Sequence, residues 1–196
     1  FSTMLIKVIA VKVALLIVLV LYTLALLFIF LYSIAQAHLV YRYLRDRKKI
    51  KNNPIQPKGN IFPHVTVQLP VYNELYVVER LIDSVASFDY PSDKLEIQVL
   101  DDSTDESVDI IAKRVKLWKD KGIDIVQVRR PIRTGFKAGA LEDGLVTAKG
   151  EFIAIFDADF VPTKDFLQKT VPHFSDKSVG MVQTRWEHIN KNYSLL

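Results

Sequence analysis

Cysteine is absent from this sequence of 196 residues, which excludes a disulfide framework and any metal site built from thiolates. Internal repeats and low-complexity segments are absent as well, and a chain of this length forms one domain, or one small domain with an appendage. The chain is 49% hydrophobic and also 24% charged. This composition indicates that apolar and charged residues occupy different segments.

Charge is missing altogether between Val13 and Tyr41, where the sequence has no Asp, Glu, Lys or Arg. A helix of about 20 apolar residues crosses a hydrocarbon core of roughly 30 Å, so this segment is long enough to span a membrane with some tilt. It is longer than the apolar core of a signal peptide. We therefore expect a transmembrane helix at residues 13–41, preceded by a short flank at 1–12.

Positive charge gathers directly after this segment. Only Asp46 opposes it there, and only Lys7 and Lys12 precede the segment. The basic residues are Arg42, Arg45, Arg47, Lys48, Lys49 and Lys51. This asymmetry predicts a cytoplasmic C-terminal side, in a plasma membrane, an inner membrane or the Golgi. The cluster suits anionic lipid headgroups, and no nucleic-acid-binding motif accompanies it. We interpret residues 42–63 as a basic juxtamembrane linker.

Residues 64–196 alternate between strand and helix patterns with short connections. Strand patterns occur at 64–72, 95–100, 123–128, 151–156 and 180–186. Helix patterns occur at 74–87, 108–118, 137–148 and 163–171. In the helix at 137–148 we expect Ala138, Leu141 and Leu145 to face inward. The alternation predicts an α/β domain around a mostly parallel sheet.

Polar residues follow three of these strands where each one ends. Asn73 and Glu74 follow the first, Asp101–Asp102 follow the second, and Asp157 and Asp159 follow the fourth. Ligands of open α/β sheets bind beyond the carboxyl ends of the strands. Up to five carboxylates at one edge repel one another unless a cation lies there. Oxygen ligands suit Mg²⁺ or Mn²⁺, which shares its coordination shell with substrate phosphates.

Each of these acids also has a purely structural interpretation. Asp101 or Asp102 can start a turn, and Glu74 can be an acid in the first turn of a helix. Ser103 and Glu106 have the spacing of a capping box, so we expect them to cap the following helix. A single Asp-x-Asp motif is common by chance. The argument for a site rests on acids at three strand ends in one domain.

A basic stretch at residues 129–141 completes the candidate site. Lys137 lies between Gly135 and Gly139 at the start of a helix, where an ammonium group and the first helical amides suit a diphosphate. A solvated surface loop is the alternative interpretation of this stretch.

The sequence contains four motifs in this order: LPVYNE, VLDDSTD, GFKAGAL and FDADFVP. Together they resemble the motifs of glycosyltransferase family 2, and the resemblance covers residues 65–196. The resemblance is greatest to the membrane-bound branch of cellulose synthases and cellulose synthase-like glucan or mannan synthases. It implies an incomplete GT-A fold with a mostly parallel sheet. It also implies inverting transfer of a sugar from UDP-glucose or GDP-mannose to a growing β-linked polysaccharide.

The resemblance also implies roles for individual residues. Asp101 and the turn at 72–74 would hold the base and ribose, and Lys137 would face the diphosphate. Asp157 and Asp159 would bind a divalent metal, Mg²⁺ or Mn²⁺, which neutralises charge on the departing diphosphate. The donor-binding residues would be Tyr72, Asn73, Glu74, Asp101, Asp102, Lys137 and Asp157.

The sequence departs from the family pattern in two places. No Thr-Glu-Asp-like motif that would supply the general base follows Asp159, and residues 183–186 are one residue short of the Gln-x-x-Arg-Trp acceptor motif. We interpret residues 183–186, which include Trp186, as part of the strand at 180–186. We therefore expect the N-terminal part of a longer enzyme, which by itself binds the donor weakly and does not turn over.

Three alternatives stay open. The first is transfer of a single sugar to a lipid acceptor, such as a polyprenyl phosphate or a ceramide. The second is a membrane-anchored phosphohydrolase, although Asp-x-Asp normally follows the first strand in those enzymes and here it follows the fourth. The third is a non-catalytic scaffold, against which the intact acid pairs argue because buried unpaired carboxylates are costly.

Overall fold

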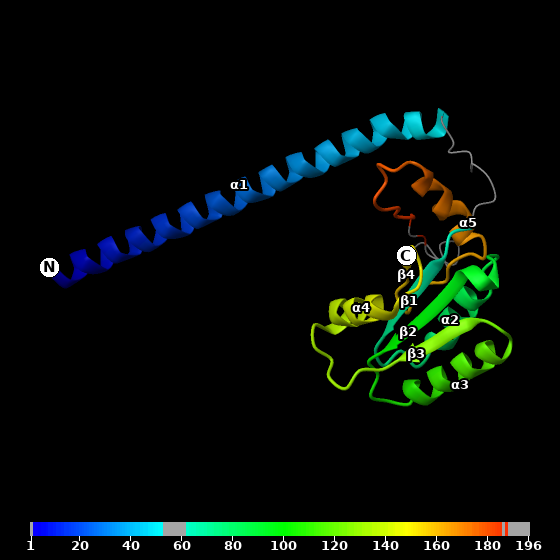
Figure 1. Cartoon of the computed structure of the whole chain (residues 1–196). Coiled ribbons are helices and arrows are strands. Elements are labelled where there is room, and N and C mark those ends of the chain that lie inside the picture. The colour runs from blue at the N-terminus through cyan, green and yellow to red at the C-terminus, as the bar shows by residue number, and fades with distance from the viewer. Residues whose placement is uncertain (1, 53–61, 186, 188–196) are drawn as a thin grey trace, which may run out of the picture. The chain divides into compact units, whose positions relative to one another are not determined.

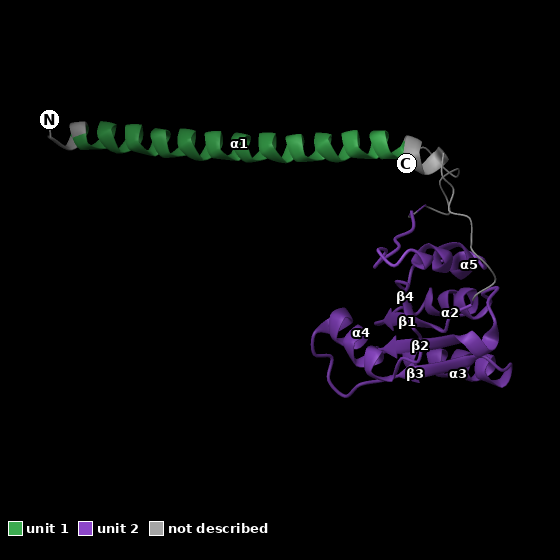
Figure 2. Cartoon of the chain, turned by 45° about the horizontal axis from the view of Figure 1, so that its top comes forward, with its two compact units in different colours: residues 1–54 green, residues 55–196 purple. Residues whose placement is uncertain are grey.

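The computed structural model describes residues 2–52, 62–185 and 187 of the chain (Figure 1). The chain divides into two compact units, residues 1–54 and 55–196 (Figure 2). The boundary between these units falls inside the segment predicted to be a linker, 42–63.

The first unit is a single helix, α1 (Ser2–Asn52). It contains the predicted span at 13–41, most of the flank before it and the start of the basic segment after it. Its portion Ile6–Arg47, 42 residues, is long and apolar enough to cross a membrane. The hydroxyl groups of Thr23 and Ser33 donate to main-chain carbonyls one turn earlier, at 2.8 Å in both cases, so these polar groups are satisfied within the helix.

The second unit is built on a four-stranded parallel sheet with the order β3-β2-β1-β4. The strands are β1 (Val65–Val71), β2 (Leu95–Asp101), β3 (Asp124–Val128) and β4 (Phe152–Ile155). The helices are α2 (Val78–Ala86), α3 (Ser107–Asp120), α4 (Phe136–Thr147) and α5 (Phe166–Thr170), with short 3₁₀ turns η1 (Ser92–Lys94) and η2 (Val171–Ser175). The predicted α/β class with a mostly parallel sheet is confirmed.

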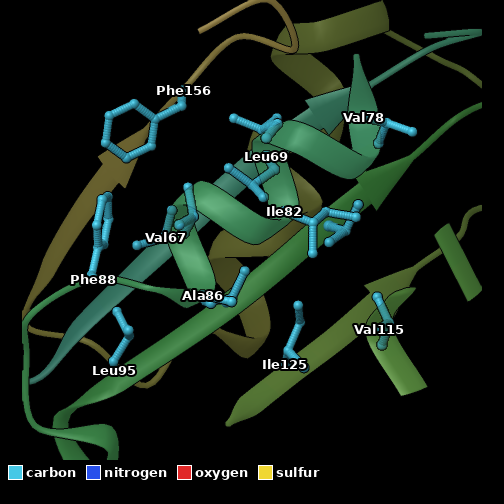
Figure 3. Close-up of a cluster of buried hydrophobic side chains, with 14 of the residues drawn as sticks. Val67, Leu69, Val78, Ile82, Ala86, Phe88, Leu95, Val115, Ile125 and Phe156 are labelled. Atoms are coloured by element: carbon cyan, nitrogen blue, oxygen red, sulfur yellow. The ribbon is translucent and has the colours of Figure 1, made fainter. Parts of the chain in front are cut away.

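The hydrophobic core lies between the sheet and the helices α2 and α3. Alternate residues of β1, including Val67 and Leu69, point into it and meet Val78 and Ile82 of α2, as Figure 3 shows. In the predicted helix at 74–87, helical spacing puts four apolar residues on one face, and all four are buried in this core: Val78, Leu81, Ile82 and Val85. Apolar and polar side chains alternate along β1, so only one register sends the apolar ones into this core.

The opposite face of the sheet is polar where α4 packs on it. Gln68 and Gln98 are fully buried there and share a hydrogen bond of 3.1 Å. Small residues of α4, Ala140 and Gly144, meet this face, and a Cβ atom on Gly144 would lie 2.6 Å from Gln68 Nε2. The prediction for α4 was therefore wrong at two positions, Ala138 and Leu145, which are exposed. The buried glutamine side chains fill the space between the sheet and α4, so small residues of α4, and not large apolar ones, face the sheet.

The predicted strand at 180–186 is also wrong over the described residues 180–185, which form no strand. Most of these side chains are exposed, including Met181. Alternating apolar residues stabilise a strand only where a neighbouring strand accepts it. Trp186 lies outside the described residues.

Candidate active site

The carboxyl ends of β1, β2 and β4 meet at one edge, because β1 pairs in parallel with β2 on one side and with β4 on the other. A cavity of about 600 Å³ opens at this edge. Its lining includes six residues predicted to bind the donor or a metal: Tyr72, Glu74, Asp102, Lys137, Asp157 and Asp159. The size is typical of a small-molecule site.

Two other predicted donor residues, Asn73 and Asp101, lie outside the described lining of this cavity. Asn73 adopts a left-handed conformation, φ 56°, which asparagine tolerates. Its N–H donates to Ser103 Oγ (3.0 Å), and its side-chain oxygen accepts from the Thr104 N–H (2.9 Å). Asp101 is buried and accepts from the Ser103 N–H (2.9 Å) and from Gln127 Nε2 (2.7 Å). Both residues hold the ends of neighbouring strands together.

The predicted capping box at Ser103 and Glu106 is wrong. Helix α3 begins at Ser107, and Glu106 is its N-cap residue without a side-chain hydrogen bond to the helix. Asp105 accepts the Ser107 N–H instead, at 3.0 Å. Ser103 is buried and joins the ends of β1 and β2, a tertiary role that the spacing of the residues did not reveal.

Asp102 is held by Arg130 through two parallel hydrogen bonds. Arg130 Nε donates to Asp102 Oδ1 at 2.8 Å, and Nη2 donates to Oδ2 at 2.7 Å. The pair is largely removed from solvent, with 12% of the arginine side chain and 6% of the aspartate side chain exposed. Hydrogen bonding to Asp102 raises the pKa of Arg130 above its ordinary value, and burial acts in the opposite direction. Arg130 is therefore a permanent cation.

Arg130 also closes the loop that leads into α4. Its Nη1 donates to the Thr134 carbonyl (2.8 Å) and to Asp143 (3.2 Å), and its Nη2 donates to the Phe136 carbonyl (2.7 Å). The loop turns through Gly135, φ 69°, a conformation that favours glycine. These contacts fix the start of α4, and with it the position of Lys137.

Lys137 donates a hydrogen bond to the Asp157 carboxylate, and both side chains are about half exposed at the cavity. The structure thus joins the lysine predicted to face a diphosphate with an aspartate predicted to bind a metal. Three of the clustered acids have basic partners on this chain: Asp101 with Arg129, Asp102 with Arg130, and Asp157 with Lys137. Much of the expected repulsion among the acids is therefore offset by the protein itself.

Asp157 and Asp159 fit the requirements of a divalent cation that is completed by a ligand. Among the described residues, Asp159 has no hydrogen-bond or ion-pair partner for its carboxylate, which is exposed at the cavity. No group of three or more His, Cys, Asp or Glu residues in the described part of the chain could hold a metal ion alone. Mg²⁺ is usually bound through one or two carboxylates together with substrate phosphates, which agrees with such a pair.

Three arginines at this edge were missed by the sequence analysis: Arg129, Arg130 and Arg133. The basic stretch that contains them was noted, but only Lys137 was given a role. The available clue was position, because these arginines follow β3, whose carboxyl end lies at the same edge as the acids.

In open parallel α/β folds, nucleotides and other ligands bind beyond the carboxyl ends of the strands, and this chain presents acids and a lysine around one cavity there. The family described as Glycosyl transferase family 2 matches residues 66–195. The chain belongs to this family, and its fold is of the GT-A type, as the resemblance implied. Family membership gives the phosphohydrolase alternative no support.

Two relatives come from Oryza sativa subsp. japonica. Probable glucomannan 4-beta-mannosyltransferase 11 is 47% identical over 140 residues, which are 69% of this chain and 25% of that protein. Probable glucomannan 4-beta-mannosyltransferase 7 is 45% identical over 140 residues, 69% of this chain and 24% of that protein. The chain therefore spans about a quarter of the length of these relatives.

A solved structure is also similar, that of mannosyltransferase PcManGT from Pyrobaculum calidifontis in complex with GDP-Man and Mn²⁺. Its TM-score is 0.60 at 34% sequence identity, and the match covers 72% of this chain and 41% of that chain. The described unit is thus similar to part of an enzyme solved with a nucleotide sugar and a divalent metal.

Proposed function

We propose that this chain is the donor-binding part of a membrane-bound, inverting glycosyltransferase. The enzyme transfers mannose from GDP-mannose, or glucose from UDP-glucose, to a growing β-linked polysaccharide. The observation that carries the proposal is the cavity of about 600 Å³ in which Lys137, Asp157 and Asp159 meet Tyr72 and Glu74. The mannosyltransferase relatives favour GDP-mannose as the donor.

The residues around the cavity divide into those that meet the donor and those that position them. Asp157 and Asp159 hold Mg²⁺ or Mn²⁺, which when bound neutralises charge on the departing diphosphate. Lys137 is free to turn from Asp157 to the diphosphate, because both side chains are half exposed. Tyr72, with 41% of its surface exposed, lines the cavity where it can contact the base or the ribose. Asn73 and Asp101 act by fixing the strand ends.

In this proposal the helix α1 anchors the enzyme in a bilayer, and the basic residues after the apolar segment favour a catalytic unit on the cytoplasmic side. The large apolar side chains of α1 are exposed along its length, from Met4 to Leu44, and a lipid environment would cover them. The chain supplies the donor half of the reaction, and the general base and the acceptor site belong to other parts of the full-length enzyme.

Donor binding is tested by calorimetry on the full-length enzyme in detergent with Mn²⁺, titrated with GDP and with UDP. We expect binding of one nucleotide that depends on the metal. Asp159→Asn should weaken this binding by more than about 10-fold, because even the outer partners of a metal site contribute about 10- to 100-fold. The matched control is Asp120→Asn on the exposed side of α3, which should leave binding unchanged.

Failure of a well-folded enzyme to bind either nucleotide would overturn the proposal. Metal-dependent binding that survives Asp159→Asn would keep the donor site but remove Asp159 from it. Transfer to a lipid acceptor differs from polymer synthesis in its products, so sizing the labelled products of the full-length enzyme separates these two outcomes.

A further inference from the structure

Arg133 lines the donor cavity, and its hydrogen-bond donors are not used within the part of the chain that the structure describes. Its Nε lies 3.5 Å from Asp102 Oδ2, which is an ion pair, yet this buried nitrogen makes no hydrogen bond. Its terminal nitrogens also donate to no group among the described residues. Arg130, three residues earlier, gives its hydrogen bonds to Asp102, Asp143 and two carbonyls. Arg130 is thus committed to the fold, whereas Arg133 has donors left for a ligand.

The Arg133 guanidinium is held in place by an aromatic ring. Its Cζ lies 3.4 Å from the centroid of the Tyr72 ring, which is direct contact with the ring face, and 5.1 Å from the centroid of Phe136. Asp102 attracts the group from a third direction. A planar fork that is already oriented loses little conformational entropy when it binds a partner. Arg133 is therefore prepared to bind a group that presents two adjacent acceptors.

We propose that Arg133 selects a guanine nucleotide over a uracil nucleotide in this cavity, an inference that rests on the proposed function. Guanine presents O6 and N7 side by side, and arginine binds this pair through two hydrogen bonds. In uracil, O4 is flanked by an N–H donor and a C–H group, so the fork has one acceptor only. In adenine, an amino donor replaces O6.

Glu74 supports the same choice of base. Glu74 also lines the cavity, and in the described part of the chain its carboxylate has neither a hydrogen-bond nor an ion-pair partner. The N1–H and the amino group of guanine form a donor pair that matches a carboxylate. The Arg133 fork, held on the Tyr72 ring, offers two donors and the Glu74 carboxylate offers two acceptors, which match the acceptor pair and the donor pair of guanine.

The experiment measures binding of GDP, IDP and UDP to the full-length enzyme in detergent with Mn²⁺. IDP keeps O6 and N7 but lacks the amino group of guanine. For the unaltered enzyme, we expect GDP and IDP to bind about 10-fold or more tightly than UDP, the size of one good bidentate contact. Arg133→Lys keeps the charge but loses the fork, so it should weaken GDP and IDP by about 10-fold and leave UDP unchanged.

Arg80→Lys, an exposed arginine on α2, is the matched control and should leave all three affinities unchanged. If Arg133→Lys lowers the melting temperature, Arg133→Gln replaces it in the comparison. Equal weakening of GDP and UDP would mean that Arg133 contacts the diphosphate, and it would overturn this inference. A preference of the unaltered enzyme for UDP would overturn it too, while the proposed function stands. Failure of a folded enzyme to bind any nucleotide would overturn both.

Discussion

Arg130 and Arg133 lie three positions apart in one loop and meet the same carboxylate, Asp102, in different ways. Arg130 makes a buried, bidentate pair, and Arg133 approaches only to 3.5 Å. A buried ion pair adds little net stability compared with apolar residues of the same shape. Removal of one partner is costly, however, because the other charge is then left unpaired away from water. At the scale of single residues, Asp102 is therefore a structural requirement of the donor edge.

Asp102→Asn is expected to destabilise the fold by about 3 kcal/mol, because it removes the buried, bidentate partner of the Arg130 cation and leaves only the more exposed Asp143 to pair with it. For a domain of this size, that corresponds to a fall in Tm of roughly 6 °C or more. Asp120→Asn, which breaks an exposed pair with Lys116, should lower Tm by about 2 °C at most. Thermal melting of the full-length protein in detergent measures both changes. Similar small effects of the two substitutions would mean that the carbonyl contacts of Arg130 suffice to hold the loop.

At the scale of elements, the position of α4 depends on how closely the preceding loop folds back on its first turn. The Gly139 N–H donates to the Gly135 carbonyl at 3.0 Å. A Cβ atom on Gly139 would lie 2.1 Å from the Thr134 carbonyl oxygen, and main-chain atoms cannot give way cheaply. Gly139 is therefore the residue that allows the loop carrying Arg133 to reach the cavity.

Gly139→Ala is expected to shift this loop and to destabilise the fold by about 1–3 kcal/mol, the usual cost of overpacking. Nucleotide binding should weaken as well, because Arg133 and Lys137 move with the loop. Gly180→Ala is the matched control, since nothing lies within 4 Å of a Cβ atom there. Melting temperature and nucleotide affinity of the full-length protein are the two measurements. Unchanged values for Gly139→Ala would show that the loop relaxes without loss of the site.

The strands and the face of α2 were predictable because apolar periodicity decides them. Val67 and Ile82 are buried because they lie on the apolar faces of a strand and of a helix that pack together, and the sequence pattern alone identifies those faces. The inward face of α4 was not predictable in the same way. Gly144 is needed there because the side chain of Gln68 leaves no room for a Cβ atom. That contact joins residues far apart in the sequence, and no local pattern records it.

The candidate site was predictable in its acids but not in its arginines. Parallel strands place their carboxyl ends at one edge, so acids after three strands had to meet there. Arg130 and Arg133 lie in one basic stretch, and only the tertiary contacts distinguish the arginine whose donors are used by the fold from the one with donors left for a ligand. The sequence predicted that Asp101 lies at this edge of the sheet. It did not show that the Asp101 carboxylate accepts hydrogen bonds from the Ser103 N–H and from Gln127 Nε2.

At the scale of the whole molecule, the two units expose different kinds of surface. The large apolar side chains of α1 are exposed along the helix, whereas the second unit buries its apolar residues around a sheet. The positive charge after the apolar segment predicts on which side of the membrane the second unit lies.

The orientation is testable with cysteines, because residues 1–196 contain none. In sealed microsomes, whose outer face is cytoplasmic, an impermeant thiol reagent should label Lys121→Cys in the second unit above the level of the unsubstituted full-length parent. Met4→Cys, before the apolar segment, should be labelled only after detergent opens the vesicles. The reverse pattern would place the catalytic unit in the lumen and contradict the charge rule. Labelling of both positions in sealed vesicles would show that α1 lies on the membrane without crossing it. The polysaccharide product would then form on the cytoplasmic side.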